Sequence, residues 1–202
     1  MNIFITGTDT NVGKTLISTI LALKLNYKYW KPIQCGLSEM SDSDWVKQYI
    51  GNDRIQKETY SLRDPLSPHL AARNDNQEIH LHKIINQFPV DKTIIEGAGG
   101  LLVPLNAKEY LIDLIPKDKC KIILVARSTL GTINHTLLSI EALKNRNLDL
   151  WGVVMMGNKN HDNKLAIEWY GKTMVLAEIP FVKKINKESL LQISEQISLE
   201  KI

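Results

Sequence analysis

Short apolar runs recur along the chain, and each is followed by Gly or polar residues and then by a longer stretch with helical spacing. The runs are rich in Ile and Val, which favour strands. Nearly every position in a run is apolar, and this is typical of strands buried on both faces of a parallel sheet. The clearest runs are Asn2–Thr6, Thr93–Glu96, Lys121–Ala126 and Leu150–Met156. The pattern predicts an α/β fold in which helices flank both faces of a mostly parallel sheet.

The rest of the pattern predicts two further strands and a set of helices. The additional strands are Tyr27–Ile33 and Val175–Ile179. The segment from Asn186 to Ile202 carries Leu and Ile at helical spacing and predicts a final packed helix. Because no Pro- or Ser-rich linker interrupts the 202 residues, we expect a single domain, residues 1–202. The other helices are expected to begin near Lys14, Asp42, Glu78, Asn134 and His161.

Composition narrows the classes of function. The hydrophobic fraction of 44% and the charged fraction of 23% are those of an ordinary globular protein. The net charge of +3 arises from residues spread along the chain, so no basic block marks a nucleic acid or a membrane surface as a partner. Cys35 and Cys120 lie far apart, which gives no support for a zinc site or a disulfide framework. We therefore expect a cytoplasmic protein that binds neither nucleic acid nor membrane.

A phosphate-binding motif lies directly after the first apolar run. Residues Gly7–Thr15 read Gly-Thr-Asp-Thr-Asn-Val-Gly-Lys-Thr and lead straight into a helical stretch. Backbone N–H groups of such a loop, together with the N-terminus of the helix, favour a polyphosphate. Lys14 can then reach the outer phosphates, and the hydroxyl of Thr15 can bind magnesium. The flanking strand and helix favour a fold of the P-loop NTPase type over the alternative, a glycine-rich turn with an exposed lysine.

Six segments, in order along the chain, resemble the motifs of the dethiobiotin synthetase family. The first is the P-loop, which has the form that this family uses, with five residues instead of four between its two glycines. The others are Tyr29–Gly36, Ser67–His69, Ile95–Gly100, Leu130–His135 and Leu176–Pro180. Because these segments span most of the chain, the resemblance is far more specific than a P-loop alone.

The resemblance implies a ligase of biotin biosynthesis that uses ATP and Mg²⁺. In that reaction carbon dioxide joins 7,8-diaminopelargonate as a carbamate, which ATP phosphorylates to a carbamic-phosphoric anhydride. The second amine then closes the ring, and the products are dethiobiotin, ADP and phosphate. The resemblance also implies a homodimer, because in the family the segment matching Leu130–His135 completes the site of the other subunit.

The same resemblance implies roles for individual residues. Lys31 would stabilise the carbamate and Lys14 the transferred phosphoryl group, so these two are the expected catalytic residues. Magnesium would be bound by Thr15, Asp44 and Glu96. Contacts to ATP would come from these metal ligands and Lys14, with Asn11, Val12, Gly13, Leu16, Gly97, Ala98, Gly99, Asn158, Pro180, Phe181 and Val182. The substrate would contact Thr10, Lys31, Cys35, Gly131 and Asn134.

Several positions leave alternatives open. Asp44 could instead be an acidic residue in the first turn of a helix that Asp42 caps, and Asp42 competes with it as the metal ligand. Cys35 stands where the family usually has a hydroxyl residue, and a thiol is a weaker hydrogen-bond partner. Met156 stands where the family reads adenine with an Asn, although Asn158 lies two residues further on.

Two other classes of function explain part of the sequence. A P-loop switch or partitioning ATPase, which acts through protein partners, shares the predicted architecture. A relative that binds the substrates without turnover would also keep the P-loop. Neither accounts for Lys31 together with Ser67–His69 and Leu130–His135. The synthetase is therefore our leading hypothesis.

Overall fold

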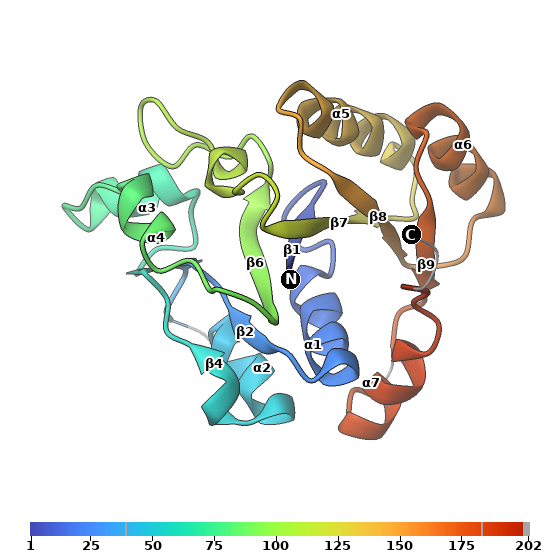
Figure 1. The fold of residues 1–202 in the computed structure, drawn as a ribbon, viewed down its shortest axis with the longest axis horizontal. Coiled ribbons are helices and arrows are strands. Elements are labelled where there is room, and N and C mark those ends of the chain that lie inside the picture. Colours follow the sequence, from blue (N-terminus) through green and yellow to red (C-terminus); the bar gives the residue numbers. More distant parts are fainter. Residues whose placement is uncertain (39, 183, 200–202) are drawn as a thin grey trace.

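The computed structural model describes residues 1–38, 40–182 and 184–199. Its main sheet has seven strands in the order β4-β2-β6-β1-β7-β8-β9, and every pair of neighbours is parallel. Strand β1 (Asn2–Gly7) lies in the middle, between β6 (Thr93–Gly100) and β7 (Cys120–Arg127) (Figure 1). The remaining strands of this sheet are β2 (Lys28–Trp30), β4 (Ile55–Gln56), β8 (Leu150–Met156) and β9 (Val175–Ile179). A separate parallel pair is formed by β3 (Ile33–Cys35) and β5 (Tyr60–Leu62).

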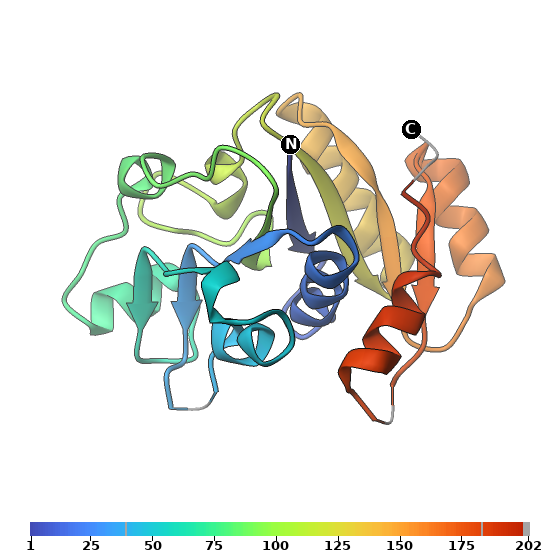
Figure 2. The same cartoon turned by 60° about the horizontal axis from the view of Figure 1, so that its bottom comes forward.

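Helices cover both faces of the main sheet, as Figure 1 and Figure 2 show. One face carries α1 (Lys14–Leu25), α2 (Asp42–Ile50) and α7 (Lys187–Ser194), and the other carries α5 (Thr132–Asn145) and α6 (His161–Gly171). The short elements are α3 (Pro68–Asn74), α4 (Leu81–Ile85), η1 (Asn52–Arg54) and η2 (Leu111–Leu114). This arrangement confirms the predicted α/β fold. Of the described helices, none has the length and apolar character that crossing a membrane requires.

The central strand β1 shows why the strand sequences are apolar at nearly every position. All six of its residues are buried. Successive side chains of a strand point to opposite faces of the sheet. Ile3 and Ile5 accordingly pack in the cluster that contains α1, whereas Phe4 packs with Trp30 and the elements on the other face. Because helices and loops cover both faces, Ile3, Phe4 and Ile5 are apolar whichever face they reach, and the buried Asn2 donates its side-chain N–H to the carbonyl of Pro89.

The predicted strand Tyr27–Ile33 is interrupted. β2 ends at Trp30, and the chain resumes at Ile33 as β3 in the smaller sheet. Pro32 lies between the two strands and has no N–H to donate to a ladder, which explains the break. Lys31 therefore stands just past the carboxyl end of β2, where ligand groups gather in parallel sheets.

Some helix positions also differ from the prediction. The helix expected near Glu78 begins at Leu81, and α5 begins at Thr132, two residues before Asn134. Helical spacing does not reveal α3 because this helix has only seven residues; its first residue is Pro68, whose fixed φ suits a helix start. The final helix is confirmed over Lys187–Ser194, and residues 200–202 of the predicted segment lie outside the described residues.

Candidate active site

The chain between β1 and α1 forms a tight loop at the carboxyl end of the central strand. Gly13 precedes α1 with a left-handed backbone (φ 100°), and no side chain of the described structure caps the first turn. The first N–H groups of α1 are therefore open to an anion. A Cβ at Gly7 would lie only 2.7 Å from Cγ2 of Val12, so glycine is required where the loop folds back on itself.

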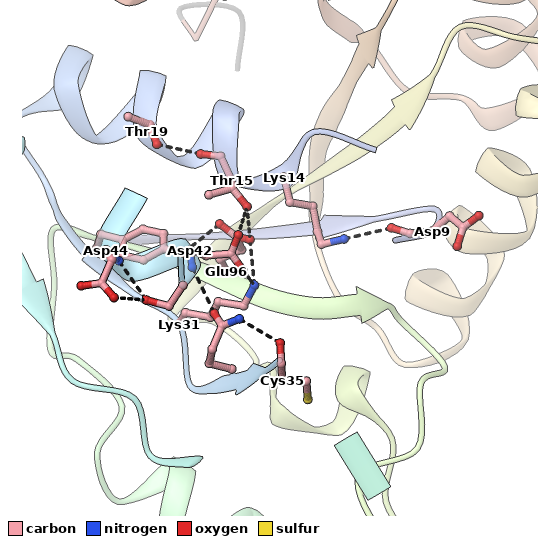
Figure 3. Close-up of polar contacts among 12 residues, drawn as sticks. Asp9, Lys14, Thr15, Thr19, Lys31, Cys35, Asp42, Asp44 and Glu96 are labelled. Carbon is pink, nitrogen blue, oxygen red and sulfur yellow. Dashed lines mark hydrogen bonds and ion pairs between the residues drawn. The ribbon is translucent and has the colours of Figure 1, made fainter. Parts of the chain in front are cut away.

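Lys14 bends back over this loop (Figure 3). Its Nζ donates to the backbone carbonyl of Asp9 at 2.9 Å, and the residue is buried. Burial lowers the pKa of Lys14, while the carboxylate of Glu96 opposes that shift. The carboxylate of Asp9 forms an ion pair with Arg127 at the end of β7, which ties the loop to the neighbouring strand.

Three oxygen-bearing side chains converge beside the first turn of α1 (Figure 3). The hydroxyl of Thr15 lies 2.7 Å from Oδ1 of Asp42 and 2.9 Å from Oε1 of Glu96. One hydroxyl has a single proton, so it can satisfy only one of these two carboxylates at a time. The other close contact between two oxygens needs a positive charge nearby. Two carboxylates and one hydroxyl, from α1, α2 and β6, thus meet at one point.

Lys31 supplies positive charge to the same cluster. Its Nζ forms an ion pair with Asp42 and lies 3.3 Å from Oε1 of Glu96, and only 9% of its side chain is exposed. Burial acts to lower the pKa of Lys31, but Glu96 and Asp42 outweigh burial and raise it. Burial also acts to raise the pKa of Asp42, and Lys31 outweighs that effect and lowers it. Lys31 is therefore held as a cation and Asp42 as a carboxylate.

Asp44, the acid that the sequence analysis chose over Asp42 as a metal ligand, does not join this cluster. Its Oδ2 accepts a hydrogen bond from the hydroxyl of Ser41 at 2.8 Å, and its other oxygen lies 3.4 Å from Nζ of Lys47. The side chain is 59% exposed. Ser41, not Asp42, is the N-cap of α2, since its hydroxyl accepts from the backbone N–H of Asp44. Residues two apart on a helix point in different directions, so only Asp42 faces Thr15.

Comparison with known proteins identifies the family. The family described as AAA domain matches residues 1–189. The ATP-dependent dethiobiotin synthetase of Lawsonia intracellularis is 48% identical over 194 residues, which cover 96% of this chain and 94% of that protein. The chain belongs to the dethiobiotin synthetase family. The dethiobiotin synthetase of Paramagnetospirillum magneticum is 45% identical over 88% of this chain and 86% of its own length. A biotin biosynthesis bifunctional protein of Bordetella avium is 42% identical over 96% of this chain and 43% of its own length.

These relatives confirm the predicted family and the prediction of an ATP-dependent ligase in biotin biosynthesis. Solved structures share the fold at low identity. The septum site-determining protein MinD of Pyrococcus horikoshii, solved with Mg-ADP, has a TM-score of 0.59 at 14% identity and covers 95% of this chain and 85% of that one. A putative plasmid partition protein of Borrelia burgdorferi, bound to AMPPNP, also has a TM-score of 0.59 at 14% identity. The match covers 100% of this chain and 98% of that one. At this identity, these likenesses show the P-loop fold alone.

The residues expected to contact the adenine of ATP lie at the carboxyl ends of β8 and β9. Met156 is buried against the P-loop, since a Cβ at Gly13 would lie 3.0 Å from its Cγ. Asn158, in contrast, is exposed. Pro180 and Phe181 are exposed as well, and the ring of Phe181 lies beside Gly157. The β8–α6 and β9–α7 loops thus lie side by side. Position 156, where the family has an Asn, holds Met156 and offers no amide group. Val182 is partly buried and packs against the core.

Other residues expected at the ATP site surround the P-loop. Val12 is buried in the core, Leu16 packs partly against it, and Asn11 is exposed with a left-handed backbone (φ 56°). The end of β6 runs alongside, because Gly100 pairs with Gly7 and the three residues Gly97, Ala98 and Gly99 precede it. A Cβ at Gly99 would lie 2.9 Å from Cγ2 of Val103. The glycines of β6 therefore permit close packing around the loop.

The residues expected at the substrate lie on two sides of the P-loop. Thr10 lines a cavity of about 400 Å³ between the loop, residues 100–104 and α5. Gly131 precedes α5 with a left-handed backbone (φ 92°) and lines an adjoining cavity, and Asn134 is exposed on the first turn of α5. Cys35 is half-buried at the end of β3, and burial raises the pKa of its thiol to about 11. At neutral pH this side chain is an uncharged thiol.

Two side chains that contact the carboxylate cluster were missed by sequence reasoning. The hydroxyl of Tyr29 donates to Oε2 of Glu96 at 3.0 Å. The side-chain oxygen of Gln34 accepts from the backbone N–H of Asp42 at 3.3 Å and fixes the start of α2 against β3. Both residues lie within the segment Lys28–Cys35, but a strand pattern shows only that they are in or next to a strand and not which carboxylate they reach.

Proposed function

We propose that this chain closes the ureido ring of dethiobiotin from 7,8-diaminopelargonate and carbon dioxide, with conversion of ATP to ADP and phosphate. The observation that carries the proposal is the position of Lys31. This second buried lysine stands at the Thr15–Asp42–Glu96 cluster next to the P-loop lysine, Lys14. Phosphate binding by the P-loop does not require Lys31, whereas a reaction that passes through an anionic carbamate does. We assign the activity to residues 1–202 as one domain.

The open N-terminus of α1 and Lys14 would bind the phosphates of ATP. The helix dipole and its free N–H groups favour negative charge there. Lys14, whose Nζ already lies at the loop carbonyl of Asp9, would stabilise the charge on the transferred phosphoryl group. Contacts to the base would come from the β8–α6 and β9–α7 loops, which carry Asn158 and Phe181.

Thr15, Asp42 and Glu96 fit a magnesium ion. All three offer hard oxygen ligands, and magnesium in proteins commonly takes one or two carboxylates and fills its shell with phosphate oxygens and water. When bound, the ion would neutralise charge on the phosphates. Asp42 replaces Asp44 in this ligand set.

The chemistry would proceed in three balanced steps. One amine of the substrate adds to carbon dioxide and loses a proton, which gives the carbamate. A carbamate oxygen then attacks the γ-phosphorus and the bond to ADP breaks. Finally the second amine attacks the carbonyl carbon, phosphate leaves and the amine gives up a proton. Lys31 would stabilise the carbamate anion, with Thr10 and Cys35 beside the substrate.

We further propose a homodimer in which the N-terminus of α5 serves the partner's site. Gly131 leaves the first N–H groups of α5 without a side-chain cap in the described structure, and such groups suit the carboxylate of the substrate. Leu130 is fully exposed and Leu138 is 58% exposed, as expected for apolar residues that a second copy would cover.

An omission assay tests the proposal. The protein is incubated with magnesium, ATP, bicarbonate and 7,8-diaminopelargonate, and dethiobiotin is sought by mass spectrometry, with each component left out in turn. The proposal expects product only in the complete mixture. ATP hydrolysis that is indifferent to the diamine, with no product, would favour a switch ATPase of the kind that shares this fold.

A further inference from the structure

Tyr29 is a buried residue that contacts the carboxylate cluster through its hydroxyl. It lies in β2, where it pairs with Ile94 of β6, and it is 0% exposed. Side chains two residues apart along an extended segment point to the same side. Tyr29 and Lys31 accordingly both reach Glu96, whose side chain projects from the neighbouring strand β6. The phenol oxygen of Tyr29 lies 3.0 Å from Oε2 of Glu96.

The two oxygens of Glu96 have different neighbours. Oε1 faces the Thr15 hydroxyl at 2.9 Å and the Nζ of Lys31 at 3.3 Å. Oε2 is bonded by the Tyr29 phenol, and among the described residues this is its hydrogen-bond partner. Glu96 is only 1% exposed, so water has little access to replace the phenol. The hydrogen bond from Tyr29 to Oε2 therefore fixes the rotation of the Glu96 carboxylate, with Oε1 facing Thr15.

The partner of Oε2 is a neutral donor. The ordinary pKa of a tyrosine phenol is about 10, so this hydroxyl carries its proton at neutral pH and can donate it. A neutral hydroxyl satisfies one oxygen of the carboxylate without cancelling its charge. The Tyr29 bond therefore leaves the charge of Glu96 to act on cations at Oε1, where Nζ of Lys31 lies 3.3 Å away.

We propose that Tyr29 is a positioning residue for metal binding: its hydroxyl holds the Glu96 carboxylate so that Oε1 is presented with Thr15 and Asp42 to the cation. The proposal rests on the proposed function only in taking this cluster as the magnesium site. It predicts that metal affinity depends on a phenol that does not touch the metal, as outer partners of metal ligands often affect affinity.

The test is the binding of Mn²⁺ to the protein with ADP present, followed by electron paramagnetic resonance. Tyr29→Phe removes the hydroxyl and leaves the ring in the core. We expect about tenfold weaker Mn²⁺ binding, the lower end of the range for outer-shell changes. The KM for magnesium should rise similarly in the synthetase assay, with a smaller change in kcat.

Tyr60→Phe is the matched control. Tyr60 is also buried, and its hydroxyl accepts one hydrogen bond, from the backbone N–H of His80 at 2.9 Å, outside the carboxylate cluster. Each variant loses one hydrogen bond of its tyrosine hydroxyl, and thermal melting measures the stability that each loses. Only Tyr29→Phe should change the affinity for Mn²⁺.

The outcomes separate the two proposals. Mn²⁺ binding by Tyr29→Phe that equals the wild type, or an equal loss in Tyr60→Phe, would overturn the positioning role even if the wild type makes dethiobiotin. A selective loss in Tyr29→Phe would uphold that role even if the wild type makes none, in which case only the proposed reaction fails. A wild-type protein that binds no Mn²⁺ with ADP would overturn the positioning role too.

Discussion

Oδ1 of Asp42 lies 2.7 Å from the hydroxyl of Thr15, although the two residues lie in the first turns of different helices. This contact joins α2 to the P-loop helix and sets Asp42 opposite Glu96. Asp44, two residues later, faces solvent and Lys47 instead. The two acids therefore have separate tasks within one helical turn, and substitution can distinguish them.

Asp42→Asn should weaken Mn²⁺ binding in the presence of ADP by about tenfold or more, because it removes one of two carboxylates from the cluster. Asp44→Asn should leave Mn²⁺ affinity within twofold of the wild type and cause only a small loss of thermal stability at the N-terminus of α2. Titrations followed by electron paramagnetic resonance compare the two variants directly. The reverse order of effects would show that Asp44 is the ligand.

Lys31→Ala should leave nucleotide affinity nearly unchanged and lower kcat for dethiobiotin formation by at least about 100-fold, as expected when a preorganised charge is removed. Lys47→Ala, which removes an exposed lysine of α2, is the control and should keep full activity. Lys14→Ala should instead reduce both nucleotide binding and turnover. Nucleotide affinity is measured by isothermal titration with ADP and magnesium. Wild-type turnover in Lys31→Ala would contradict the carbamate role.

Cys35 should be a poor nucleophile at neutral pH. Burial raises the pKa of its thiol from 9.0 to about 11, so its thiolate fraction at pH 8 is about 100-fold lower than without the shift. The rate of alkylation by iodoacetamide should therefore be slow and rise about tenfold per pH unit until the pH approaches 11. Cys120, with a pKa of about 12, should react more slowly still. Cys35→Ser isolates Cys120 as the control. A rate that levels off below pH 9 would contradict the assigned burial.

Much of the fold follows from the sequence because its physical signals are local. The Ile- and Val-rich runs mark buried parallel strands, and the Gly-rich turn before Lys14 marks the P-loop. The break at Pro32 is also readable, since proline cannot continue a ladder. The start of α2 is readable too, because Ser41 and Asp44 have the spacing of a capping box. This spacing gives Asp44 a role at the N-terminus of the helix and leaves Asp42 as the acid available to the site.

The contacts that complete the site are not local. Tyr29 and Glu96 are separated by 67 positions and meet only because β2 pairs with β6. Likewise, Thr15 meets Asp42 across 27 positions once α2 packs beside α1. Strand order and helix packing decide such contacts, and a single sequence carries no direct record of either.

The central claim is tested most directly by carbon-13 bicarbonate. The protein is supplied with the labelled bicarbonate, magnesium, ATP and 7,8-diaminopelargonate, and the ureido carbon of any dethiobiotin is examined by mass spectrometry and nuclear magnetic resonance. We expect the label in that carbon, with one ADP formed per dethiobiotin. ADP formed at the same rate without the diamine, and no labelled product, would contradict the account.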